Sequence, residues 1–94
     1  MTPVIDQTQA LALVKARLNR TPGDTSLDVY LMARLEAAVA QLERTGIRLT
    51  AGVDDLLLAV DLTVYNYQNR DKEGKEPDWL RARRRERWVQ QRDP

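Results

Sequence analysis

The sequence predicts an all-α fold, with a small bundle of three core helices plus a peripheral basic C-terminal helix. Apolar residues recur every three or four positions in three segments, which is the period of an amphipathic helix. Glycine, proline or charged residues separate these segments, and the alternation typical of strands is nearly absent. The 94 residues make one small chain. We expect a helical core domain over residues 1–70, a charged linker over 71–76 and a basic helical arm over 77–94.

Capping residues and turn signals predict the first two helices. Asp6 begins a helix over about residues 7–19, and a loop that contains proline and glycine ends it. Thr25 or Ser26 caps the second helix, and Gly46 ends it as a left-handed C-terminal residue. Apolar periodicity in these helices and the next predicts the core. The predicted core residues are Leu11, Val14, Leu18, Leu27, Leu31, Leu35, Leu42, Leu56, Val60 and Val64.

The third predicted helix, over about residues 51–69, is apolar on two sides. Such a helix is either central in its own domain or lends one side to a neighbour. The side opposite the core face carries Leu58, Leu62 and Tyr65. We predict that these three residues form a subunit interface and are more exposed in an isolated subunit than the core residues.

The C-terminal segment combines arginine with tryptophan. Residues 81–92 hold six Arg and one Glu, whereas the rest of the chain holds nine basic against thirteen acidic residues. Trp79 and Trp88 are nine positions apart, which places them on opposite sides of a helix. Tryptophan and arginine are enriched at interface anchors, so we predict a partner-binding arm. Its predicted anchors are Trp79, Leu80 and Trp88, and its predicted steering charges are Arg83, Arg84 and Arg87.

The composition argues against an enzyme. Histidine and cysteine are absent, which removes the commonest general base, the commonest metal ligand and any disulfide. We therefore predict no catalytic, cofactor-binding or metal-binding residues. Asp54 and Asp55 form the only adjacent carboxylate pair, and we interpret them as favourable charge at a helix N-terminus. Asp61 lies at the edge of a core face and either stays in water or pairs with Arg34.

No apolar run is long enough to predict a membrane span, and the first residues lack the pattern of a signal peptide. We therefore expect synthesis in the cytoplasm and no membrane partner.

Five short segments give the chain a resemblance to the head–tail connector (adaptor) proteins of long-tailed bacteriophages and prophages. They are GIRL (46–49), DDLLLAV (54–60), VYNYQNRD (64–71), PDWLRAR (77–83) and ERW (86–88). The resemblance implies a helical, non-catalytic virion protein made in the host cytoplasm. It also implies a ring, generally a dodecamer, below the portal protein. Such a ring extends the DNA channel without reading DNA sequence, and receives the next head-closure or tail protein.

An alternative interpretation stays open. The arginine cluster also suits a small helical regulatory protein or a nucleic-acid-binding protein, because several Arg side chains can neutralise backbone phosphates. Salt separates the two interpretations: nucleic-acid binding weakens steeply with added salt, whereas a contact anchored by tryptophan does not.

Overall fold

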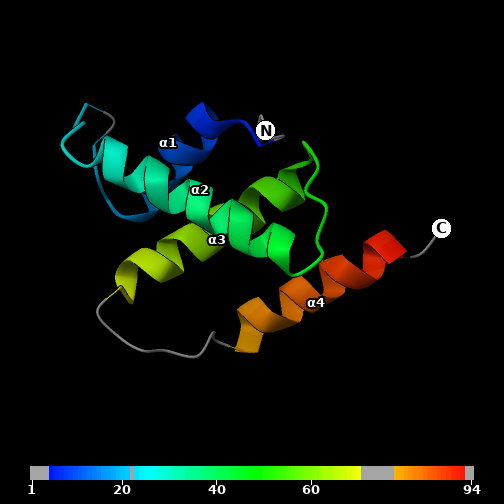
Figure 1. Cartoon of the computed structure of the whole chain (residues 1–94). Helices are drawn as coiled ribbons and strands as arrows, with labels where there is room; N and C mark the ends of the chain where they lie inside the picture. The colour runs from blue at the N-terminus through cyan, green and yellow to red at the C-terminus, as the bar shows by residue number, and fades with distance from the viewer. Residues whose placement is uncertain (1–4, 22, 71–77, 93–94) are drawn as a thin grey trace.

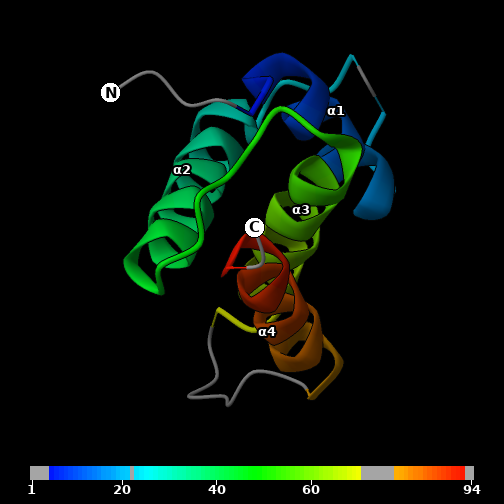
Figure 2. The ribbon, with the colours of Figure 1, turned by 90° about the vertical axis from the view of Figure 1, so that its right-hand side faces the viewer.

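The computed structural model describes residues 5–21, 23–70 and 78–92, and confirms the all-α fold. Its four helices are α1 (Gln7–Arg17), α2 (Asp28–Arg44), α3 (Val53–Gln68) and α4 (Asp78–Arg92). The first three pack together, and α4 lies at the periphery along α3 (Figures 1 and 2). No strand occurs in the described ranges. The predicted linker over 71–76 lies outside them.

The helix ends follow the local chemistry, with one correction. The Asp6 side chain accepts a hydrogen bond from the Gln9 backbone N–H at 3.1 Å, as the capping pattern predicts. Gly46 has a φ of 95° and ends the turn after α2. The prediction that Thr25 or Ser26 caps α2 is wrong. Ser26 instead bonds to Asp24 within the preceding loop, and α2 begins two residues later without a side-chain cap.

All ten predicted core residues belong to the hydrophobic core or pack against it. Seven of them are buried, and Leu11, Leu18 and Leu27 are partly buried. The core also takes in Ile5, Ala10, Ala38, Ile47, Leu58, Ala59, Leu62 and Leu80. The periodicity of the first three helices therefore predicts the core correctly but incompletely.

The second face of α3 is part of the core, which corrects our prediction. Leu58 and Leu62 are 3% and 1% exposed, within the range of the predicted core set, and Tyr65 is only half-buried. The reason is that α3 is central: α1 and α2 pack on it, and α4 covers a further side. Leu58 and Leu62 are thus unavailable as exposed interface residues in the isolated chain.

Candidate partner-binding surface on the C-terminal helix

One side of α4 faces the body of the protein. Leu80, Arg83, Arg87 and Gln91 follow one another at intervals of three and four residues, so they lie on one side of the helix. Leu80 is 1% exposed and belongs to the core. Arg83 pairs with Asp61 and Arg87 with Asp55, so α4 runs antiparallel to α3 (Figure 1). The three predicted site residues Leu80, Arg83 and Arg87 therefore act within the chain, and Leu80 is not a partner anchor.

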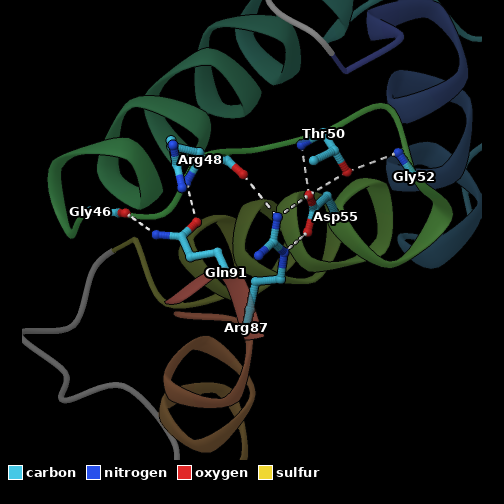
Figure 3. Close-up of polar contacts among 7 residues, drawn as sticks. All are labelled: Gly46, Arg48, Thr50, Gly52, Asp55, Arg87 and Gln91. Carbon is cyan, nitrogen blue, oxygen red and sulfur yellow. Dashed lines mark hydrogen bonds and ion pairs between the residues drawn. The ribbon is translucent and has the colours of Figure 1, made fainter. Parts of the chain in front are cut away.

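Helix α4 makes a cluster of polar contacts around the buried Asp55 (Figure 3). Arg87 donates from Nε to Oδ1 at 2.6 Å and from Nη2 to Oδ2 at 3.1 Å. Thr50 donates from its backbone N–H at 2.7 Å and from its hydroxyl at 2.8 Å. Arg87 Nη2 also donates to the Arg48 carbonyl at 2.9 Å. The Asp55 carboxylate, 1% exposed, is thereby satisfied from two segments of the chain, α4 and the loop before α3.

The charges of this cluster stabilise each other. Burial opposes ionisation of Asp55, but the hydrogen bonds from Arg87 and Thr50 outweigh it and lower the pKa of this carboxyl below its ordinary 3.8. The same hydrogen bond to Asp55 raises the pKa of Arg87 above its ordinary value, against the effect of burial. Our interpretation of Asp55 as helix-terminal charge therefore covers only part of its role, because its carboxylate also fastens α4.

The far end of α4 contacts the loop between α2 and α3. Gln91 accepts a hydrogen bond from the Arg48 backbone N–H at 2.7 Å and donates to the Gly46 carbonyl (Figure 3). Trp88 approaches the same turn: a Cβ atom at Gly46 would lie 3.2 Å from Trp88 Nε1. Both the positive φ and this close approach favour glycine at position 46.

A groove of about 450 Å³ lies between α4 and the loop that follows α2. Among the described residues that line it, three are arginines and none carries a carboxylate. We call it the basic groove; its lining residues are Thr45, Ile47, Arg81, Arg84, Arg85, Trp88 and Val89. Trp88 is 36% exposed and Val89 is 48% exposed, so the groove offers apolar surface together with positive charge.

The opposite flank of α4 differs in charge. A hollow of about 210 Å³ there is lined by Asp54, Asp55, Leu58, Arg83, Glu86, Arg87 and Gln90. Trp79 is on this side of the helix, 49% exposed, with the Arg83 guanidinium 6.0 Å from its ring centroid. The two arginines of this hollow are paired with Asp55 and Asp61, and Asp54 and Glu86 add negative charge. The two flanks of α4 therefore differ in charge, since described carboxylates line one of them and not the other.

The structure divides the six predicted partner-binding residues into two groups. Arg84 and Trp88 line the basic groove, and Trp79 is exposed on the other flank. Leu80, Arg83 and Arg87 hold α4 in place. The predicted site residues did not include Arg81, Arg85 and Val89, although their spacing from Trp88 places all four on one side of a helix.

The Asp61 interactions also differ from our expectation. Asp61 pairs with Arg17 and Arg83, which bridges α1, α3 and α4. Arg34 instead donates from Nε to the Tyr30 hydroxyl at 2.9 Å. The proposed pair between Asp61 and Arg34 is therefore wrong, because two other arginines reach this carboxylate.

Comparisons with known family models, curated proteins and solved structures find no match to this chain. Among the described helices, none combines the length and the apolar character needed to cross a membrane. In the same described ranges, no three acidic side chains gather into a group that could hold a metal ion.

Proposed function

We propose that this chain is a structural subunit of a phage or prophage head–tail connector. Copies would form a ring below the portal protein, around the path of the packaged DNA, and join the head to the next tail protein in the virion. The resemblance of five segments to that family motivates the proposal. The observation that carries it is the basic groove, because an exposed tryptophan among arginines is the composition of interface anchors.

Two exposed apolar patches provide candidate contacts between subunits. Val29, 88% exposed, and Tyr30, 40% exposed, lie in the first turn of α2. Val53, 67% exposed, and Leu57, 39% exposed, lie at the start of α3. The first turns of α2 and α3 lie well apart in the structure (Figure 1). Two different and separate patches suit a head-to-tail contact, which closes into a ring when the rotation permits.

Electron microscopy of the protein mixed with the portal encoded nearby tests this function. We expect a ring of added density on one end of the portal, and its loss with Val53→Asp or Val29→Asp. These substitutions should leave circular dichroism unchanged, because both side chains are exposed. A protein that stays separate from the portal at every ratio would refute the connector proposal.

The alternative proposal is a nucleic-acid-binding or regulatory protein that uses the arginines of α4. Arg81, Arg84 and Arg85 favour it, because clustered arginines bind backbone phosphates. The remainder of the chain is acidic and would repel a long polyanion. Binding to duplex DNA that weakens steeply with salt, in a protein that ignores the portal, would support this alternative.

A further inference from the structure

We propose that copies of this chain associate head to tail, with a basic face of one copy against an acidic face of the next. The basic face joins the start of α2 to the end of α3, and its residues are Val29, Tyr30, Arg34, Tyr67 and Arg70. The acidic face joins the start of α3 to α4, and its residues are Val53, Asp54, Leu57 and Glu86. The inference rests on the proposed function, since it names the residues by which one subunit would hold the next.

The apolar side chains exposed outside α4 gather on these two faces. In the described ranges, the large ones are Val29 and Tyr30 on the basic face, and Val53 and Leu57 on the acidic face. Contact between the faces would remove this apolar surface from water, which favours association.

Two arginines give the basic face its positive charge. Arg34 donates from Nε to the Tyr30 hydroxyl at 2.9 Å, and the Arg70 guanidinium lies 4.3 Å from the centroid of the Tyr67 ring. The two tyrosine rings meet edge to face, with centroids 6.0 Å apart, so α2 and the end of α3 form one surface. None of the ion pairs in the described ranges involves either arginine. Arginine combines stacking on an aromatic ring with bidentate binding of a carboxylate, which suits this face to an acidic partner.

Two carboxylates give the acidic face its negative charge. Asp54 and Glu86 are exposed, and both line the hollow of about 210 Å³ beside α4. The arginines of this hollow, Arg83 and Arg87, already pair with carboxylates of α3. No ion pair within the described part of the chain involves Asp54 or Glu86. The hollow therefore presents negative charge to a neighbouring molecule, next to the apolar side chains at the start of α3.

Complementary charge selects a second copy in a head-to-tail arrangement. Two basic faces, or two acidic faces, would bring like charges together, and such a contact is disfavoured. A basic face against an acidic face pairs opposite charges and covers apolar surface on both sides. Both halves of this contact are on the same chain, and the first turns of α2 and α3 lie well apart (Figure 1). One copy can therefore bind a neighbour on each side, as a ring or a filament requires.

Sedimentation velocity of the full chain at low ionic strength tests the proposal. We expect the average mass to rise with concentration and to fall with added salt, because salt screens the charges at the rim. Val29→Asp sets a negative charge against the acidic face of the next copy, and Val53→Lys sets a positive charge against its basic face. Each variant alone should be monomeric where the native chain associates. A native chain that is monomeric up to about 1 mM would overturn the proposal.

A mixture of the two variants distinguishes a head-to-tail contact from a symmetric one. Val29→Asp leaves the acidic face intact and Val53→Lys leaves the basic face intact, so the mixture should form complexes with one copy of each. These complexes should stop at two copies, because both remaining faces are blocked. In a symmetric contact at least one variant would associate by itself as the native chain does. That result, or a mixture without complexes, would refute the arrangement.

Charge reversal tests the pairing itself. The basic reversal combines Arg34→Glu with Arg70→Glu, and the acidic reversal combines Asp54→Lys with Glu86→Lys. Each reversal should weaken association at least about tenfold, and all four changes in one chain should restore it to within about threefold at unchanged net charge.

The charge control is Arg44→Glu, exposed near the other end of α2, which should change association less than about twofold. Circular dichroism verifies that each variant folds. Reversals without effect, or a folded combined chain that does not recover, would refute the pairing.

The portal experiment separates this inference from the connector function. A ring that forms on the portal equally well with the basic reversal would overturn this contact and leave the connector function standing. Association that follows the charge reversals in a protein that ignores the portal would support the contact and refute the connector function.

Discussion

Replacing Arg87 by methionine tests how firmly α4 is fastened to the body. The variant keeps a long unbranched stem but removes the guanidinium that donates to both carboxylate oxygens of Asp55, at 2.6 and 3.1 Å. Asp55 is 1% exposed, so water cannot easily replace these donors. The two hydrogen bonds from Thr50 remain, but they leave the buried negative charge without its counterion.

The expected loss of stability follows from this geometry. Removing one partner of a buried ion pair costs about 3–5 kcal/mol. The Arg87 side chain is 15% exposed, which gives the site some access to solvent, and Thr50 still satisfies part of the carboxylate. We therefore expect about 3 kcal/mol, the lower end of that range. A loss of this size is a large fraction of the roughly 5–15 kcal/mol that stabilises a typical domain.

Urea denaturation followed by circular dichroism measures this loss. Arg85→Met is the matched control: Arg85 is exposed on the same helix, and its replacement should change stability by less than about 0.5 kcal/mol. In the double variant Asp55→Asn with Arg87→Met, part of the loss should be recovered, because no buried charge remains unpaired. A loss for Arg87→Met no larger than that of Arg85→Met would refute our account of how α4 is held.

The remaining predictions concern pH and the core. Because Asp55 has a lowered pKa when folded, its contribution to stability is complete above its ordinary unfolded pKa of 3.8 and is lost as pH falls through the folded pKa. Denaturation at several pH values should show this loss in the native chain and little of it in Arg87→Met; equal acid sensitivity of both would contradict it. Leu80→Ala should cost about 2–5 kcal/mol, and Val89→Ala much less, in the same urea assay. Leu62→Asp should abolish the helical circular dichroism signal, because the side chain is 1% exposed; a folded variant would show that α3 tolerates charge there.

The sequence contained enough information to predict the first three helices. In α2, Leu31, Leu35, Ala38 and Leu42 recur at helical intervals on one side, and all four are buried. Such a signal is local, because the apolar spacing within one helix is enough to indicate which side of that helix is buried. The loop before α2 was harder, because Asp24 and Ser26 both have the chemistry of a helix cap and the sequence does not show which backbone groups they reach.

The docking of α4 could not be predicted in the same way. Only Leu80 of its inner side is apolar, so no periodic apolar stripe marks the side that packs. The other contacts are polar and distant in sequence: Arg87 and Asp55 are 32 residues apart. The sequence shows that both charges exist but not that they pair. The same gap explains the error at Leu58 and Leu62, because the sequence does not show that α4 packs on a further side of α3.

The uneven charge of the chain has two different consequences in the structure. Residues 81–92 are strongly basic and the rest is acidic, a pattern that with the two tryptophans predicts a partner-binding arm. Arg83 and Arg87 instead neutralise Asp61 and Asp55, so part of the asymmetry is an internal set of counterions. Three other arginines of α4, Arg81, Arg84 and Arg85, line the basic groove on the other flank, around Trp88. We therefore expect stability and the proposed binding to depend on different arginines of one helix. Substitutions on the inner side should lower the free energy of unfolding, and substitutions in the basic groove should lower affinity while the fold persists.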